Sequence, residues 1–449
     1  MADTFSQNLD TVPELLDIIA EYPRQYPFFL DSAATGPLGR YSLLLRAGPR
    51  FLSLDRNGAL TGPGDADHFL DRLKQWYEVD ATKPTGQSQG PFVGGWFVYL
   101  GYELAGEIEP VLELPVAEQG LPVALAVRCE GAVIIEHGEQ DTTRLVAESP
   151  QILDRMQQEV RCVPSRAHGS PATIEHLRPE SEADFKQAVS RIKEYLRAGD
   201  IFQVNLSRAW TGSFDVPVDA LDIYRRLRRS NPAPFAGLMI WGGDTLMSSS
   251  PERLVDVRGS VVQTRPIAGT YPRSKDRESD QALARDLLAH PKERAEHIML
   301  IDLERNDLGR VCEHGSVEVS ELMVLESYAH VHHIVSNIRG KLDAQATPAD
   351  VIRAVFPGGT ITGCPKVRCM QIIAELEQRG RGFYTGSMGY ISRDGQMDLN
   401  ILIRSMLLSG RDIALRTGAG IVMDSVAERE LAETVAKARG LLLALEYGA

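Results

Sequence analysis

The segment from Phe356 to Glu377 reads FPGGTITGCPKVRCMQIIAELE and joins a glycine-rich loop to a predicted helix. Glycines and hydroxyls ahead of a helix N-terminus are typical of loops that bind anions through backbone N–H groups. A nucleotide-binding P-loop also needs a glycine directly before its lysine and a serine or threonine after it. Here Pro365 precedes Lys366 and Val367 follows it. The loop therefore suits a carboxylate better than a phosphate, and the alternative is that Gly358 and Gly359 simply form a tight turn.

Sequence patterns on both sides of this loop predict mixed strands and helices. Residues 1 to about 170 read as short strands separated by glycine and proline, and the hydrophilic stretch 162–182 reads as a linker. We place a boundary at about 165 to 180, between a mainly β N-terminal region (1–170) and a second region (180–447). Strands followed by helices indicate an α+β fold in which sheets and helices form a sandwich.

Helices are predicted in three segments. The first follows Ser181 and stops at Gly199, and the second forms a helical block over roughly 276–308. The last begins at about residue 426. Its opening, Ser425-Val-Ala-Glu428, spells a capping box, in which each of the two polar side chains satisfies a free backbone N–H.

The composition excludes several classes of protein. The 449 residues carry a net charge of −13, which argues against a general affinity for nucleic acid or anionic membranes. The five scattered cysteines include no CxxC pair, so neither a disulfide framework nor a zinc site is indicated. The N-terminus lacks a signal-peptide pattern, and no apolar run has the length of about 20 residues that spans a bilayer. We expect a cytoplasmic protein.

Two helical segments carry carboxylates at a spacing that suits a metal site. Glu293 and Glu296 are three residues apart, as are Glu430 and Glu433, so each pair shares one helix face. Two such faces brought together would offer the oxygen ligands that Mg²⁺ prefers. Each pair could equally be a solvated helix face, with Glu433 simply pairing with Lys437.

Further polar residues stand where loops meet apolar strands. Glu252 follows SSSP, and Arg404 ends the apolar run LNILIR, where a buried guanidinium needs an anion. Gly418 and Gly420 offer backbone N–H groups next to an apolar strand. His333, inside a predicted strand, is by itself more typical of a core histidine than of a catalyst.

Together these segments resemble the chorismate-utilising enzyme family. The resemblance runs densely and in order over about residues 180–445 and rests on these stretches: YLRAGDIFQVNLSRAW, SSSPERL, TRPIAGTYPR, KERAEHIMLIDLERNDLGRVC, YAHVHHIVS, FPGGTITGCPKVRCMQIIAELE, FYTGSMGYIS and TGAGIVMDS. The N-terminal part resembles the family's more variable region. The resemblance implies a large antiparallel β-sheet sandwich flanked by helices, with the active site between sheets and helices.

The resemblance also implies roles for individual residues. Glu296 and Glu433 would bind Mg²⁺ directly, with Glu293 and Glu430 close by, and Thr360 would hold the ring carboxylate of chorismate beside the ion. Glu252 would be the general acid that protonates the departing 4-hydroxyl, assisted by His333. The enolpyruvyl carboxylate would be held by the remaining substrate-binding groups: Tyr384, Arg404, Lys437 and the N–H groups around Gly418 and Gly420.

Two positions bear on the nucleophile and the product. Relatives that add water carry a lysine base where this chain has Gln203, so ammonia is the expected nucleophile. Relatives that aminate C4 often have a lysine where this chain has Ala268, whereas those that make anthranilate have alanine. The wording FPGGTITG favours amination at C4, which gives 4-amino-4-deoxychorismate for p-aminobenzoate and folate synthesis. Anthranilate formation for tryptophan synthesis is the alternative.

The ammonia is expected to come from another chain. No segment resembles the Gly-x-Cys-x-Gly nucleophile elbow of a glutaminase. The resemblance therefore implies a separate glutamine amidotransferase subunit as partner. A third hypothesis is a non-catalytic subunit that binds an aromatic amino acid or serves as a scaffold.

Overall fold

The structure is a computed structural model of the whole chain, and its description covers residues 4–10, 13–34, 38–82, 90–118, 120–161, 163–166, 174, 176–274, 276–327 and 331–446. The helices are α1 (Leu15–Glu21), α2 (Phe69–Asp80), α3 (Ala105–Ile108), α4 (Pro150–Arg161), α5 (Glu182–Ala198), α6 (Ala220–Ser230), α7 (Arg277–Ala289), α8 (Pro291–Gly309), α9 (Pro348–Val355), α10 (Lys366–Glu377) and α11 (Ala427–Ala444), with 3₁₀ turns η1 (Tyr102–Leu104) and η2 (Gly359–Ile361).

The strands are β1 (Phe5–Leu9), β2 (Phe28–Asp31), β3 (Tyr41–Leu54), β4 (Leu60–Thr61), β5 (Gly95–Leu100), β6 (Ala124–Glu136), β7 (Thr142–Ala147), β8 (Arg178–Pro179), β9 (Gln203–Ser213), β10 (Phe235–Trp241), β11 (Asp244–Ser250), β12 (Arg253–Arg258), β13 (Val261–Thr264), β14 (Ile267–Pro272), β15 (Glu318–Ser327), β16 (Val331–Lys341), β17 (Gly363–Cys364), β18 (Ser387–Ser392), β19 (Met397–Asn400), β20 (Ser405–Ser409) and β21 (Asp412–Ile421).

The long strand β6 divides the sheet into two layers. One edge of β6 pairs with β3, while the other pairs with β5 over residues 124–129 and with β7 over residues 131–136. One layer then runs β7–β6–β3–β2–β10–β11–β20–β21–β9, and the other runs β6–β5–β18–β19–β12–β13–β16. These pairings are antiparallel, as a sandwich of antiparallel sheets requires. The expected fold class is confirmed.

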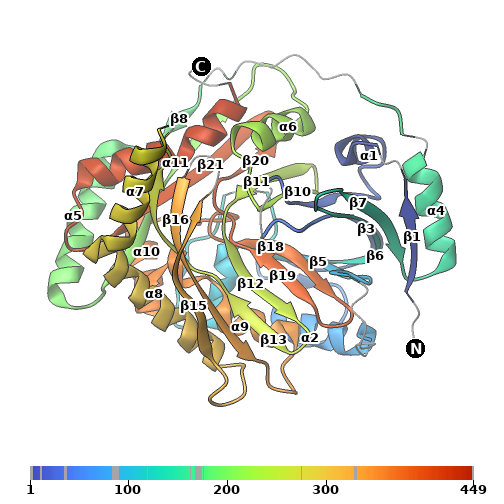
Figure 1. Ribbon diagram of the computed structural model, residues 1–449, viewed down its shortest axis with the longest axis horizontal. Helices are drawn as coiled ribbons and strands as arrows, with labels where there is room; N and C mark the ends of the chain where they lie inside the picture. Colours follow the sequence, from blue (N-terminus) through green and yellow to red (C-terminus); the bar gives the residue numbers. More distant parts are fainter. Residues whose placement is uncertain are drawn as a thin grey trace.

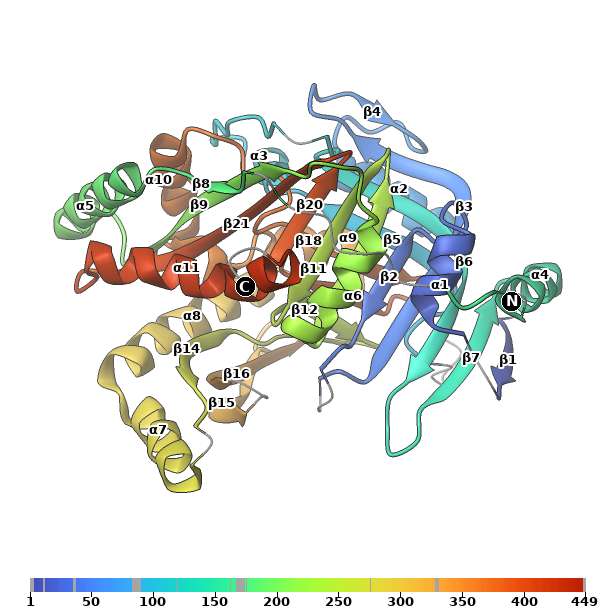
Figure 2. The same ribbon diagram turned by 90° about the horizontal axis from the view of Figure 1, so that it is seen from above.

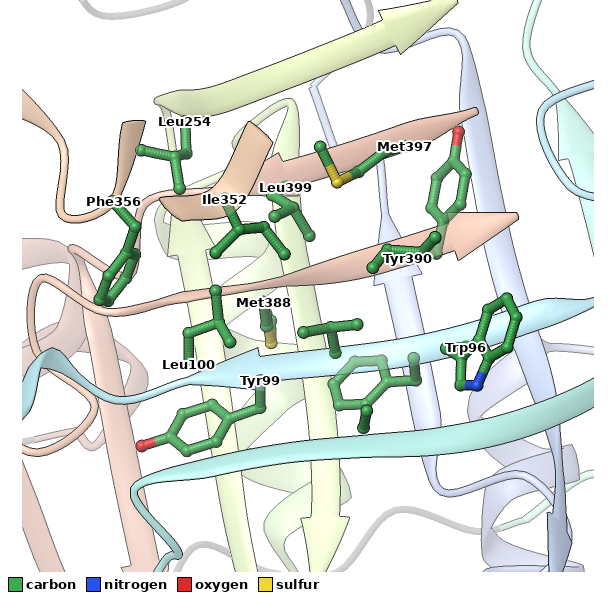
Figure 3. Packing of buried hydrophobic residues seen from close by; sticks show 14 of the residues in the cluster. Trp96, Tyr99, Leu100, Leu254, Ile352, Phe356, Met388, Tyr390, Met397 and Leu399 are labelled. Carbon is green, nitrogen blue, oxygen red and sulfur yellow. The ribbon is translucent and has the colours of Figure 1, made fainter. Parts of the chain in front are cut away.

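The main hydrophobic core joins strands of both layers to the helices α2 and α9. It joins strand residues such as Trp96, Leu254 and Leu399 to Ile352 of α9 (Figure 3). Phe356, the first residue of the glycine-rich loop, packs into this same core with only 2% of its surface exposed. The loop is therefore anchored at its beginning by buried aromatic surface, which is worth about 2–3 kcal/mol for such a side chain.

Helices cover the outer faces of both layers. The helices α6 and α11 lie side by side over the β11–β20–β21 part of the sheet, and α5 and α10 cover β9 (Figures 1 and 2). The helices α7 and α8 stand against β14 and β16 (Figure 2). Strands β9 and β21 thus end between α8 and α11, where the glycine-rich loop also arrives.

The predicted helix ends are right in two cases and wrong in one. Gly199 ends α5 with a left-handed φ of 79°, and α10 follows the glycine-rich loop as expected. The capping box at Ser425 is wrong, because α11 begins with Val426 as its N-cap and has no side-chain cap. The Ser425 hydroxyl instead accepts a hydrogen bond from the backbone N–H of Val422 at 3.1 Å, so it closes the preceding turn.

The two predicted regions share this architecture. Strand β5 of the first region pairs with β18 of the second, and β2 pairs with β10. Whether the regions are separate domains stays a prediction, and residues 162, 167–173 and 175 of the linker predicted over 162–182 lie outside the described residues. The four cysteines within the described residues are free. Among the residues that the structure describes, no helix has both the length and the apolar character to cross a bilayer.

Candidate active site

Glu252 is a buried carboxyl at the turn between β11 and β12. It is 6% exposed, and burial raises its pKa to about 7. The Thr360 hydroxyl, Arg404 and Lys437 lower that pKa in part, which places all three near the carboxyl. The Thr360 hydroxyl falls short of hydrogen-bond geometry, so Glu252 Oε1 and Thr360 Oγ1 both lack a partner within the described residues. A carboxyl that keeps its proton near neutral pH suits general acid catalysis.

Arg404 connects the carboxyl to the other side of the site. Its backbone is in the left-handed region (φ 52°), which costs a non-glycine residue about 1 kcal/mol. Burial lowers the pKa of Arg404, and the nearby Tyr384, Glu252 and Glu433 oppose that shift. Its guanidinium makes no ion pair or hydrogen bond within the described residues. A half-buried guanidinium without such a partner is suited to bind an anion.

Gly418 and Gly420 leave room for neighbouring side chains on β21. A Cβ at residue 418 would stand 2.6 Å from the Tyr384 hydroxyl and 2.8 Å from Asn205 Oδ1. A Cβ at residue 420 would overlap the Gln203 amide nitrogen. The absence of side chains here opens the strand so that groups from β9 and from the loop before β18 can reach it.

Gln203 on β9 ties this glycine stretch to α8. Its amide nitrogen donates a 2.6 Å hydrogen bond to Glu296 Oε1, which fixes the orientation of the amide. Gln203 Oε1 is consequently turned the other way, buried and without a hydrogen-bond partner within the described residues. This oxygen accepts hydrogen bonds but cannot deprotonate water.

Two of the four predicted metal ligands, Glu296 and Glu433, lie close to the glycine stretch and come from two helices. Glu296 Oε1 lies 3.7 Å from the Cβ position of Gly420, on the α8 side. On the α11 side, Lys437 bonds to Glu433 at 2.6 Å and to the Gly418 carbonyl at 3.0 Å. Glu430 is buried one turn before Glu433. The carboxylates of Glu296 and Glu433 therefore flank one short stretch of β21.

This donor set suits Mg²⁺ only in part. Within the described residues no three histidine, cysteine, aspartate or glutamate side chains gather closely enough to hold a metal ion by themselves. Mg²⁺ in enzymes commonly uses one or two carboxylates and fills its other positions with water and substrate oxygens. Glu296 and Glu433 fit that pattern, and the metal site stays a prediction.

His333, Ala268 and Glu293 meet at the strand pair β14–β16. The pKa of His333 is lowered to about 4 by burial, with Arg404 contributing and the backbone of Gly269 opposing. Gly269 adjoins the buried Ala268, and a Cβ at residue 269 would stand 3.0 Å from Glu293 Oε2. His333 is therefore a neutral side chain near Arg404, and it can donate or accept a hydrogen bond without adding charge.

Lys366, the lysine that made the glycine-rich loop resemble a P-loop, is engaged elsewhere. Its ammonium lies 2.6 Å from Asp307 of α8 and 3.4 Å from the Val355 carbonyl. It ties the end of the loop to α8 and is not available to an anion in the site. The rejection of a nucleotide site is consistent with this geometry.

The sequence reasoning missed three polar features around the site. Asn205 lies two residues after Gln203 on β9, and its Oδ1 is buried without a hydrogen-bond partner within the described residues. Glu304 of α8 is a second buried carboxyl, 6% exposed, close to Gly359. Behind the site, Glu377 forms buried ion pairs with Arg381 at 2.7 Å and Arg416 at 3.0 Å. The i, i+2 spacing on β9 was the only signal available for Asn205.

A surface cavity of about 1270 Å³ adjoins the site at α8. Glu296 forms part of its wall together with Pro365 of the glycine-rich loop. Its rim carries large apolar side chains that face solvent: Phe202 is 68% exposed, Ile298 51% and Met423 41%. Clustered exposed apolar residues of this kind mark interaction surfaces.

Comparison with known proteins gives one family. The model of the family described as "chorismate binding enzyme" matches residues 45–443. An anthranilate synthase component I-like protein of Synechocystis sp. is 41% identical to this chain. The alignment covers 91% of this chain and 83% of that protein. The aminodeoxychorismate synthase component 1 of Bacillus subtilis is 40% identical, covering 84% of this chain and 82% of its own length.

Two further proteins resemble the chain over most of its length. The anthranilate synthase component 1 of Thermus thermophilus is 40% identical over 99% of this chain and 97% of its own. In structure, anthranilate synthase component I from Streptococcus pneumoniae superposes with a TM-score of 0.79 at 33% identity, covering 91% of this chain and 93% of that one. Relatives with different products are thus about equally similar to the chain.

Proposed function

Because the chain belongs to the chorismate-binding enzyme family and is a chorismate-utilising enzyme, we propose that it aminates chorismate with ammonia to give 4-amino-4-deoxychorismate. The observation that carries the proposal is the buried Glu252, whose pKa is raised to about 7 by burial, facing the unpaired guanidinium of Arg404. An acid beside an anion-binding group is what a substrate with two carboxylates and a hydroxyl leaving group needs.

The reaction requires a proton before the carbon–oxygen bond can break. Glu252 donates its proton to the 4-hydroxyl, which leaves C4 of the ring as water. The ammonia nitrogen forms the new bond to C4. Arg404, Tyr384 and Lys437 hold the enolpyruvyl carboxylate during this step by charge-assisted hydrogen bonds. The neutral His333 lies beside Arg404 and orients the leaving-group edge without adding a charge that would compete for the carboxylate.

Mg²⁺ is part of the proposal. Glu296 and Glu433 would hold the ion, with Glu293 and Glu430 close by, and Thr360 would hold the ring carboxylate beside it. The bound ion supplies a Lewis acid for that carboxylate. The positions of Glu296 and Glu433 on either side of Gly418–Gly420 support this assignment.

Ammonia rather than water is the proposed nucleophile. Gln203 cannot act as a base, and its free Oε1 and the Oδ1 of Asn205 are buried acceptors that suit an N–H donor. Ammonia is itself a nucleophile and needs no deprotonation. We therefore favour amination over hydration.

Anthranilate is the second candidate product, and Ala268 favours it. This residue is buried on β14, and it supplies no side-chain nucleophile that could form an adduct with the ring. The FPGGTITG spelling of the loop favours 4-amino-4-deoxychorismate. Function as a non-catalytic subunit is disfavoured, because the proposed catalytic groups are side chains of suitable chemistry.

The product is tested by incubating the purified chain with chorismate, Mg²⁺ and an ammonium salt, with and without an added aminodeoxychorismate lyase. We expect p-aminobenzoate only when the lyase is present. Fluorescent anthranilate formed without the lyase would replace the first candidate with the second. Absence of any turnover at high ammonium would favour the non-catalytic hypothesis.

The apolar rim around Phe202, Ile298 and Met423 is the proposed docking surface of a glutamine amidotransferase subunit. Neutral ammonia is protonated in water, so a subunit that delivers it must cover the opening beside Glu296. Apolar side chains around that opening would be buried by such a partner. The word "component" in the names of the relatives agrees with a two-subunit enzyme.

Phe202→Asp tests this surface. With an amidotransferase subunit added, we expect glutamine-dependent activity to fall about tenfold or more, because a charge at an apolar interface is costly. Ammonium-dependent activity of the same variant should stay within about twofold of the unchanged chain. Val79→Asp, a change at a residue that is 81% exposed on α2, is the control for both assays. Equal loss of both activities would reject the rim as a docking surface.

A further inference from the structure

Arg381 is a buried arginine in the loop between α10 and β18, behind the candidate active site. It is 1% exposed, and its guanidinium forms a two-point ion pair with Glu377, the last residue of α10. The distances are 3.0 Å from Nε to Oε2 and 2.7 Å from Nη2 to Oε1. A carboxylate bound at two points fixes the plane of the guanidinium and thus the directions of its other N–H groups.

The other N–H groups of Arg381 reach three segments that lie far apart in the sequence. Nη1 donates to the Ile361 carbonyl of the glycine-rich loop at 3.2 Å and to the Thr385 hydroxyl at 3.3 Å. Nη2 donates to the Asn205 carbonyl of β9 at 2.8 Å. A guanidinium has five N–H groups, so these three bonds and the two to Glu377 use all of them.

Each of the three segments carries a group with a proposed role at the substrate. Thr360 adjoins the bonded carbonyl of the loop, and its Oγ1 is buried without a hydrogen-bond partner within the described residues. The Oδ1 of Asn205 is in the same condition. Tyr384 adjoins the bonded threonine, and its ring centroid lies 5.6 Å from Cζ of Arg381. Arg381 therefore fixes the backbone beside these groups without using the two side-chain oxygens.

The turn that carries Tyr384 depends on Arg381 in a second way. Thr385 has a left-handed φ of 61°, which is unfavourable for a β-branched residue. Its backbone N–H donates to the Leu402 carbonyl at 2.9 Å, and its hydroxyl accepts the bond from Arg381. At the start of the turn, the backbone N–H of Arg381 donates to Glu103 at 2.6 Å. The turn is thus held through both the backbone and the side chain of Arg381.

We propose that Arg381 is a positioning residue for chorismate, which holds the glycine-rich loop, β9 and the turn of Tyr384 at the spacing at which their polar groups bind the substrate. With all five N–H groups engaged, it offers none to the substrate itself. Its charge is compensated by Glu377, so it does not compete with Arg404 for a substrate carboxylate. This role rests on the proposed function, in which Thr360 and Tyr384 hold the two carboxylates of chorismate.

Arg381→Lys separates positioning from charge. Lysine keeps a positive charge for Glu377, but its three N–H groups come from one nitrogen and cannot reach acceptors on three separate segments. Chorismate is titrated by calorimetry into the chain with Mg²⁺ and without ammonium. We expect the variant to bind chorismate about tenfold or more weakly than the unchanged chain. Equal affinity would overturn the proposal, because the charge alone would then be sufficient.

Arg416→Lys is the matched control. Arg416 is 5% exposed and bonds to the same Glu377 at 3.0 Å. Its only other hydrogen bond within the described residues goes to the Ser207 hydroxyl at 2.7 Å, and one ammonium group can make both contacts. This variant should bind chorismate as the unchanged chain does. An equal loss of affinity in both variants would show that the ion pairs only support the fold, and would overturn the proposal.

Thr385→Val covers the case in which Arg381→Lys does not fold. Valine is close to threonine in size and removes only the hydroxyl, and with it the bond from Arg381. We expect chorismate to bind on the order of threefold more weakly, because the turn of Tyr384 loses one support. Unchanged affinity would overturn the proposal. These measurements follow binding, so a wrong assignment of the product would leave their results intact.

Discussion

At the scale of single residues, Glu252 shows how a catalytic group can cost stability. A glutamate in an unfolded chain ionises near its ordinary pKa of 4.5, whereas burial raises the pKa of Glu252 to about 7 in the folded protein. Between these two values the unfolded chain releases a proton that the folded protein keeps. The free energy of unfolding therefore falls as pH rises from about 4.5 to 7 and is highest below that range.

Glu252→Gln should reverse this cost. The amide keeps the shape and has no charge to desolvate, so the variant should unfold at higher temperature than the unchanged chain at pH 8. The gain is at most about 3 kcal/mol, since each unit of pKa shift corresponds to about 1.4 kcal/mol. Thermal unfolding followed by circular dichroism at pH 5 and pH 8 measures it. A difference in melting temperature that does not grow between the two pH values would contradict the assignment.

The sequence could predict residues whose chemistry is tied to a local pattern. Glu252, Arg404 and the glycines of β21 stand in short motifs, and the structure brings them to one place. Glu304 and Asn205 had no such pattern, because a glutamate on a helix and an asparagine in a strand are common surface residues. Their importance arises from burial, which depends on contacts distant in sequence.

At the scale of elements, the meeting of β21 with α8 and α11 builds the site. The two glycines of β21 allow Gln203 and Tyr384 to approach, and the helices bring Glu296 and Glu433 to the same stretch. The helices themselves could be predicted from the sequence, whereas the convergence of α8 and α11 depends on sheet order. The false capping box at Ser425 has a similar cause, because a loop closed by its own hydrogen bond competed with the helix for that hydroxyl.

Gly420→Ala should damage the site without unfolding the chain. The added methyl group would displace Gln203, and with it the hydrogen-bonded Glu296. We expect turnover to fall on the order of tenfold to a hundredfold, because small displacements of catalytic groups have effects of that size. Far-UV circular dichroism should be unchanged. Gly309→Ala, at a glycine of α8 with open space around it, is the matched control and should keep full activity. Equal activity of both variants would show that the close approach at residue 420 is not needed.

At the scale of the whole molecule, β6 makes the N-terminal region part of the catalytic sandwich. It continues both layers, and β5 and β2 pair directly with strands from the second half of the chain. The sequence indicated the individual strands but not this sharing, since pairing between strands far apart in the chain leaves no local signal. Whether the boundary at residues 165–180 separates two folding units can be measured.

A fragment of residues 180–449 should not fold alone. Removal of the first region would expose the edge of β18 and the edge of β10, together with the core surface that Trp96 and Phe97 cover. Open edges and apolar surface of this kind lead to aggregation. We expect the fragment to be insoluble or to unfold without a cooperative transition. A soluble fragment with a sharp thermal transition would instead establish an independent domain.

The central claim is that the candidate active site aminates chorismate with Glu252 as the general acid. NMR of chorismate turnover tests this claim most directly. Proton spectra should show chorismate consumed by the unchanged chain only when ammonium and Mg²⁺ are both present. Glu252→Gln should slow that consumption by about 10²–10⁴-fold, the usual contribution of a general acid. Consumption of chorismate without ammonium, or normal turnover by Glu252→Gln, would contradict the account.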